Sequence, residues 1–205
     1  MKTHAQEHRD LFATLPAIDA IANDRLHDLL VARARKAGLL DVAYRTLDTV
    51  VGRLLLAATP RGLLRVAFDC ENHDRALATI AEVLSPRILE APERLDAVSR
   101  EIDEYLAGRR KRFDLPLDLS LSHGFRREVL RRLQRIAYGR TASYATIAVE
   151  AGSPRAVRAV GTACATNPLP LVIPCHRVVR SDGTIGQYAG GTHVKKTLLA
   201  MESAS

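Results

Sequence analysis

The stretch Leu171-Val172-Ile173-Pro174-Cys175-His176-Arg177-Val178-Val179 is the part of the chain that most strongly constrains its fold and chemistry. A cysteine lies directly before a histidine, with apolar residues on both sides. The thiolate is the reactive form of cysteine, and a free thiol is mostly protonated near neutral pH. His176 can act as the base that removes the thiol proton, directly or through water. The pair alone also fits an incidental neighbourhood, because adjacent side chains of an extended segment point apart.

Length and composition indicate a folded, cytoplasmic protein. The 205 residues suffice for one large domain or two small ones, and 47% of them are hydrophobic. No apolar run approaches the roughly 18 to 20 residues of a membrane span, and the first 20 residues lack the apolar core of a signal peptide. Three cysteines are too few, and odd in number, for a disulfide framework, which favours a reducing compartment: Cys70, Cys164 and Cys175.

The net charge of +7 is concentrated in the C-terminal part. Residues 121–205 contain 12 basic and 4 acidic side chains, a net charge of +8, whereas residues 1–120 contain 18 and 19, a net charge of −1. This asymmetry favours a polyanionic partner, most simply nucleic acid. The alternative is a solvated basic face.

The spacing of apolar and turn residues predicts the structure of residues 1–40 and 41–120. Residues 1–40 have apolar residues at helical spacing and end near Gly38, which predicts a helical N-terminal extension. Its histidines lack metal-ligand spacing, so no zinc site is expected: His4, His8 and His27. Residues 41–120 predict a small α+β domain. It would comprise an antiparallel meander over 42–69, helices over 74–84 and 92–106, and an edge strand or linker over 113–119.

Residues 121–205 predict a helix-turn-helix domain. After a helix beginning near Ser122, Ser143 is a suitable cap for a helix over 144–151, and Ser153-Pro154 predicts the start of the next helix. That second helix would be the recognition helix, with one long cation, Arg158, among small residues: Ala156, Ala159, Gly161, Thr162 and Ala163. A short strand or wing over 184–188 and a last helix over 192–202 would follow. Helical hairpins that never touch DNA have the same spacing.

The run from Ser143 to Glu202 resembles the O6-alkylguanine-DNA alkyltransferases, also called methylated-DNA–protein-cysteine methyltransferases. The matching residues extend without gaps over about 60 positions: Ser143-Tyr144, Arg158-Ala159-Val160-Gly161, Asn167-Pro168, Ile173 to Val179, Ser181, Gly183, Gly186, Tyr188 to Gly191, Lys195, Leu198-Leu199 and Glu202. The resemblance implies a ribonuclease-H-like α+β domain followed by a helical, winged helix-turn-helix-type alkyltransferase domain. For residues 41–120 the likeness lies in the order of elements alone.

The resemblance also implies a reaction, the repair of O6-alkylguanine and more weakly O4-methylthymine in duplex DNA. Cys175 would accept the alkyl group irreversibly, once per molecule. His176 would be the base through water, Glu202 would orient it, Asn167 would hold the turn before the cysteine, and Tyr144 would assist proton transfer to the leaving guanine. Without the resemblance, simpler roles fit: a helix-end carboxylate for Glu202, a helix stop for Asn167 and a capping-region aromatic for Tyr144.

Further residues are assigned to DNA binding through the minor groove, which suits a helix without long base-reading side chains. Arg158 would fill the stack in place of the flipped nucleotide; a phosphate contact or a solvated side chain is its alternative. The other expected DNA contacts are Tyr144, Ala156, Ala159, Gly161 and Ser181. The guanine pocket would be lined by Pro170, Val178, Val179, Tyr188 and Ala189. The resemblance implies a monomer without cofactor or metal.

The sequence departs from the family pattern in three places. Ala165-Thr166 replaces a basic or asparagine-rich step before Asn167, and Val157 is bulkier than the alanine often found before the arginine. The first 40 residues lack the four zinc cysteines of dual-function regulatory relatives. Three other classes of function are weighed: a non-catalytic lesion binder, in which the cysteine is replaced, a helix-turn-helix protein that senses alkylation, and a cysteine hydrolase.

Overall fold

The computed structural model describes residues 20–204, and contacts within the chain divide it into two compact units, with the boundary in the sequence between Leu39 and Leu40. The first unit contains α2 (Ala20–Lys36), followed by Gly38 at a φ of 66°. The helix expected before Gly38 is therefore confirmed. The rest of the predicted extension, with His4 and His8, lies outside the described residues. The described part of the chain includes no helix long and apolar enough to cross a membrane.

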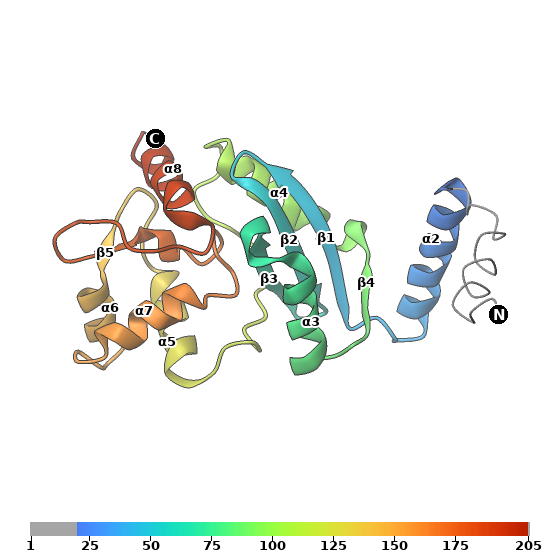
Figure 1. Ribbon diagram of the computed structural model, residues 1–205, viewed down its shortest axis with the longest axis horizontal. Coiled ribbons are helices and arrows are strands. Elements are labelled where there is room, and N and C mark those ends of the chain that lie inside the picture. The colour runs from blue at the N-terminus through green and yellow to red at the C-terminus, as the bar shows by residue number, and fades with distance from the viewer. Residues whose placement is uncertain (1–19, 205) are drawn as a thin grey trace, which may run out of the picture. The chain divides into compact units, whose positions relative to one another are not determined.

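The second unit begins with a four-stranded sheet in the order β3-β2-β1-β4 (Figure 1). The first three strands form the predicted antiparallel meander: β1 (Val42–Thr49), β2 (Gly52–Thr59) and β3 (Gly62–Phe68). The short β4 (Ile88–Glu90) pairs parallel to β1 and was not predicted, since three residues carry no visible alternation.

Helices cover both faces of this sheet. Figure 1 shows α3 (His73–Val83) and α4 (Asp96–Leu106) on opposite sides of the strands, and two 3-10 turns precede them, η1 (Asp69–Glu71) and η2 (Pro92–Leu95). Successive strand residues point to opposite faces. Leu56 accordingly belongs to the core cluster that contains α4, whereas its neighbour Ala57 packs with Ile80 of α3.

The segment after α4 is fastened to the edge of the sheet. Leu63 N–H donates to Pro116 O at 2.8 Å, and Asp118 N–H donates to Leu63 O at 2.8 Å. Gly62 permits this approach, because an added Cβ would lie 2.2 Å from Pro116 O. The prediction for residues 113–119 left open an edge strand or a linker. The segment is a linker with a single bridge, Leu63 to Leu117, to the strand it crosses.

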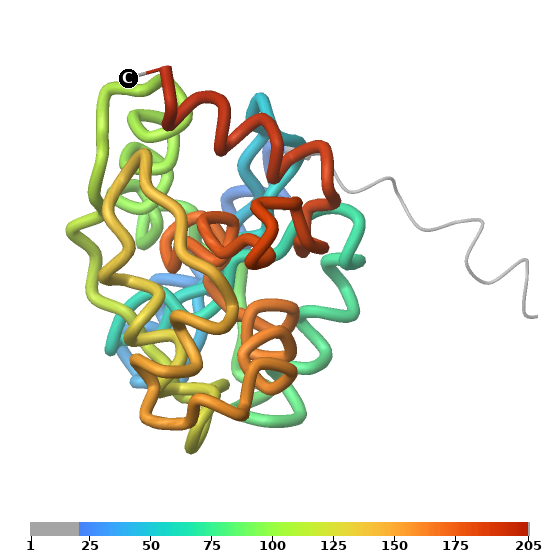
Figure 2. Tube along the Cα trace, turned by 90° about the vertical axis from the view of Figure 1, so that its left-hand side faces the viewer, coloured from blue at the N-terminus to red at the C-terminus, as the bar shows by residue number. Residues whose placement is uncertain are grey.

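The C-terminal half consists of short elements that share a core cluster with the sheet and α4. These elements are α5 (Gly124–Leu133), β5 (Ala142–Ser143), α6 (Tyr144–Glu150), α7 (Val157–Ala165), η3 (Cys175–Arg177), β6 (Val178–Val179) and α8 (Gly191–Ser203). Ser143 caps α6 as predicted, since its Oγ accepts from Thr146 N–H at 3.0 Å. Figure 2 shows the stretch between α7 (orange) and α8 (dark red) passing through the centre of the view. The α+β class is therefore confirmed.

One local prediction was wrong, and the structure rules out one alternative of another. The helix expected from Pro154 begins at Val157, because residues 153–156 form a turn in which Ala156 N–H donates to Ser153 O at 2.9 Å. Residues 184–188, expected as a short strand or wing, contain no strand. The Asp182 carboxylate accepts from Thr184 N–H at 2.9 Å and holds the turn over residues 181–183 that precedes this segment. The strand pairing of this half lies elsewhere, between β5 and β6, which run parallel.

Candidate active site

Cys175 opens η3 and is almost completely buried, with 2% of its surface exposed. Asn167, at the end of α7, fixes the segment that leads to it. The Asn167 side-chain amide donates to Cys175 Sγ at 3.1 Å and to Ile173 O at 2.9 Å, and its carbonyl accepts from Leu169 N–H at 3.0 Å. One side chain thus connects the segment just after α7 to the thiol. The role of holding this turn, expected for Asn167 from the family resemblance, stays a prediction.

The thiol rests in its protonated form. Burial raises the pKa of Cys175 to about 11, although the Asn167 hydrogen bond and the Lys195 ammonium oppose this shift. Lys195 is itself fully buried, and its Nζ donates to Val178 O at 2.6 Å. Since the thiolate is the nucleophile, reaction near neutral pH requires a base that takes the thiol proton.

A buried carboxylate stands at the centre of the polar network. Glu202 Oε1, on α8, lies 2.9 Å from His176 Nε2, and both side chains are inaccessible to solvent. Arg177 donates to the same carboxylate through Nη2 at 2.8 Å and Nε at 2.9 Å, and Gly139 N–H donates at 3.1 Å. Burial alone would raise the pKa of Glu202, but the His176 and Arg177 hydrogen bonds hold this pKa well below its usual range. Glu202 is therefore ionised at neutral pH.

This network determines which nitrogen of His176 is basic. Burial lowers the pKa of His176 below its usual value, against the opposing effect of Glu202. The imidazole is therefore neutral near pH 7. Because an ionised carboxylate only accepts hydrogen bonds, Nε2 carries the proton and Nδ1 has the free lone pair. Nδ1 is buried and makes no hydrogen bond to any residue between 20 and 204.

Two tyrosines approach the thiol and its base. Tyr144 opens α6, and burial followed by the charges of Cys164 and Cys175 raises its pKa. A Cβ added at Gly186 would lie 2.6 Å from the Tyr144 hydroxyl, so a larger residue there would displace the Tyr144 side chain. Tyr188 packs edge-on against the His176 ring, with the centroids 6.1 Å apart. The other predicted pocket residues are buried or half-buried: Pro170, Val178, Val179 and Ala189.

The predicted DNA contacts lie at the surface. Arg158 and Ala159 are exposed on α7, and the Arg158 guanidinium has no hydrogen bond or ion pair within the described part of the chain. Ala156 and Gly161 are partly exposed on the same helix or at its start, and Ser181 is exposed in the turn that follows β6.

Sequence reasoning assigned no role to three residues of the network, Tyr105, Arg177 and Lys195. The Tyr105 hydroxyl donates to Glu202 Oε1 and lies 3.2 Å from His176 Nε2. Arg177 and Lys195 were part of the family resemblance, which was the available signal for both. Nothing local marks Tyr105, which lies 71 positions before His176.

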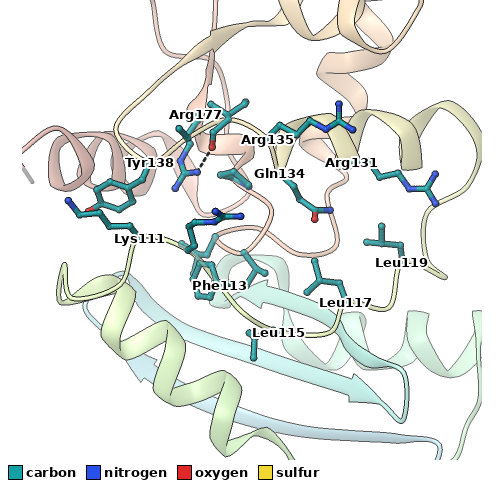
Figure 3. A pocket seen from close by; sticks show the side chains of 16 residues that line it. Lys111, Phe113, Leu115, Leu117, Leu119, Arg131, Gln134, Arg135, Tyr138 and Arg177 are labelled. Carbon is teal, nitrogen blue, oxygen red and sulfur yellow. Dashed lines mark hydrogen bonds between the residues drawn. The ribbon is translucent and has the colours of Figure 1, made fainter.

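A pocket of about 880 Å³ lies on the other side of Arg177 (Figure 3). Its lining comes from residues 111–119, the end of α5 with residues 134–138, and the stretch Leu171 to Pro174. Arg177 Nη1 donates to Ile136 O at 2.6 Å at this wall, the dashed line in Figure 3. Leu171 adopts a φ of 72°, a strained backbone for a leucine. Within residues 20–204, no group of His, Cys, Asp or Glu side chains is placed to hold a metal ion.

Comparisons with known proteins agree over most of the chain. Residues 42–119 match the family model described as the 6-O-methylguanine DNA methyltransferase ribonuclease-like domain, and residues 124–204 match the DNA binding domain of the same family. A methylated-DNA–protein-cysteine methyltransferase of Mycolicibacterium paratuberculosis is 40% identical over 78% of this chain and 92% of that protein. The constitutive enzyme of that name from Bacillus subtilis is 37% identical over 79% of this chain and 96% of that protein.

Solved structures give the same result. The structure of Mycobacterium tuberculosis O6-methylguanine methyltransferase superposes with a TM-score of 0.70 at 32% identity, covering 80% of this chain and 93% of that one. A structure of Mycobacterium tuberculosis OGT in complex with DNA gives a TM-score of 0.68 at 32% identity, over 79% and 93% of the two chains. With both halves of its second unit matched, the chain belongs to the 6-O-methylguanine DNA methyltransferase family.

Proposed function

We propose that this protein repairs O6-alkylguanine in duplex DNA, and more weakly O4-methylthymine, by transferring the alkyl group to its own Cys175. The observation that carries the proposal is a buried thiol beside a His176–Glu202 pair, held at 3.1 Å by the Asn167 amide, in a chain of this family. Relatives with 37–40% identity are named methylated-DNA–protein-cysteine methyltransferases.

The chemical step follows from the protonation states. His176 Nδ1 accepts the Cys175 proton through a water molecule while sulfur attacks the alkyl carbon in line with the C–O6 bond. The S–C bond forms, the C–O6 bond breaks with its electron pair on O6, and Tyr144 assists protonation of the leaving guanine. One alkyl group moves from O6 to sulfur, and one proton moves from sulfur to guanine. The thioether is stable, so each molecule reacts once. No cofactor or metal enters this balance.

DNA binding brings the alkylated nucleotide to the active site flipped out of the duplex. The reacting carbon of a base-paired guanine is inaccessible inside the duplex, so the nucleotide must be flipped towards Cys175 at a cost of a few kcal/mol. Arg158, exposed and without a partner among the described residues, is proposed to fill the vacated space. The small residues of α7, with Ser181, would enter the minor groove, and the basic C-terminal half would contact phosphates.

We further propose that the protein acts as a monomer in the reducing cytoplasm. Cys70, Cys164 and Cys175 are all free thiols, which suits such a compartment. The alternative is a non-catalytic lesion binder or an alkylation-sensing helix-turn-helix protein. The buried cysteine and its base favour transfer over binding alone.

Alkyl transfer can be measured by mass. Incubation with a duplex carrying O6-methylguanine should add the mass of one methylene group to the intact protein, located by peptide mapping on Cys175. Cys175→Ala should gain nothing, whereas Cys164→Ala, which removes the other buried thiol, should react as the wild type does. Methylation of the Cys175→Ala variant, or none of the wild type, contradicts the proposal.

The flipping role of Arg158 predicts a substrate-dependent defect. Arg158→Ala should slow transfer from duplex O6-methylguanine about tenfold, because nothing then offsets the cost of unstacking. Transfer from free O6-benzylguanine should be unchanged, since a free base needs no flipping. Single-turnover rate constants measure both reactions. Equal slowing with the two substrates would remove this role.

The pH dependence of transfer from free O6-benzylguanine should report His176. The rate requires the neutral imidazole, whose pKa lies below its usual value because of burial. The rate constant should therefore be constant at neutral and higher pH, and it should fall only on the acid side of the usual imidazole pKa, as His176 becomes protonated. A rate that instead keeps rising through pH 9 and above would follow ionisation of the thiol itself and contradict catalysis by His176.

A further inference from the structure

One tyrosine from the sheet-containing half reaches into the active site. Tyr105 is fully buried at the end of α4, more than 60 residues before the cysteine segment. Its hydroxyl donates to Glu202 Oε1 and lies 3.2 Å from His176 Nε2. The hydroxyl therefore contacts both members of the pair that activates the thiol.

Aromatic neighbours fix the position of this ring. The centroid of Phe113 lies 5.0 Å from that of Tyr105, and the centroid of Tyr138, which packs edge-on, lies 6.1 Å away. Both distances fall in the range of attractive aromatic pairs. Because the ring is held from two sides, the hydroxyl is presented to Glu202 and His176 in one place.

The direction of each hydrogen bond follows from charge. Burial, and then the nearby Glu202 carboxylate, raise the pKa of Tyr105 well above its usual value, so the hydroxyl keeps its proton at working pH. The hydroxyl donates that proton to the carboxylate, and its oxygen can accept from the imidazole Nε2–H. Nε2–H thus faces two acceptors, which disfavours the tautomer that would place the proton on Nδ1.

We propose that Tyr105 is a positioning residue for alkyl transfer, which holds His176 and Glu202 so that Nδ1 stays unprotonated and aimed at the thiol. This inference rests on the proposed function and adds a residue to it. No bond forms or breaks at Tyr105. The ribonuclease-like half thereby contributes directly to the reactive arrangement, through α4.

The test is the Tyr105→Phe variant of the full chain, which retains the aromatic packing and removes the hydroxyl. Single-turnover transfer should slow about tenfold, by the same factor for duplex O6-methylguanine and for free O6-benzylguanine, because the hydroxyl acts after the base has bound. The matched control is Tyr44→Phe, which removes the hydroxyl of a half-buried tyrosine on β1 that packs against the second core cluster. That variant should react at the wild-type rate.

Partial misfolding of the Tyr105→Phe variant would not change the measured rate constant. The amplitude of a single-turnover reaction reports the fraction of competent protein, and its rate constant reports the speed of that fraction. A tenfold lower rate constant supports the positioning role whatever the amplitude. A wild-type rate constant overturns it.

A double-mutant cycle separates positioning from a general structural effect. If the hydroxyl acts through the imidazole, Tyr105→Phe should cause no further slowing in a His176→Ala background. The same tenfold loss in both backgrounds would mean that the hydroxyl acts independently of His176, which contradicts the proposal. Absence of transfer in the wild type would contradict the proposed function, whereas transfer at equal rates by the wild type and Tyr105→Phe contradicts only the role of Tyr105.

Discussion

The rest of the site depends on the hydrogen bonds that satisfy the buried carboxylate of Glu202. Removing an ionised carboxylate from water costs several kcal/mol, which only well-placed hydrogen bonds offset. Its donors come from separate parts of the chain: Tyr105 on α4, Gly139 between α5 and β5, and His176 and Arg177 in η3. Satisfying one charge on α8 therefore fixes the relative positions of four segments.

The same charge governs the chemistry. It holds the proton of His176 on Nε2 and leaves Nδ1 as the basic atom, while burial keeps the imidazole neutral. Burial keeps His176 ready to react but keeps Cys175 unreactive. It raises the pKa of the thiol to about 11, so the sulfur stays protonated until the base removes its proton. A thiol that is consumed in one reaction benefits from this protection against other electrophiles.

The sequence predicted the regular elements and the local site, and it missed contacts between distant segments. The short strand-like runs of β1 to β3, separated by turn residues, and the Ser143 cap are properties of short windows, so both were predicted correctly. Asn167, Cys175 and His176 could be proposed as site residues because they lie close together in a specific motif, and the structure brings them together. Tyr105 was missed because its partners are far along the chain, and β6 because its pairing with β5 is decided by tertiary packing. For residues 184–188 the sequence left open a strand or a wing, and the structure has no strand there because whether an extended segment finds a pairing partner is decided by tertiary packing.

An ionised Glu202 organises the reactive site, and the Glu202→Gln variant shows whether its charge is needed. Glutamine keeps the shape and removes the charge, which leaves Arg177 buried without its counterion. The measurement is the single-turnover rate constant with free O6-benzylguanine, alongside the free energy of unfolding in urea. We expect a rate constant about a hundredfold lower and a loss of about 3 kcal/mol of stability. A variant with wild-type rate and stability would contradict this role of Glu202.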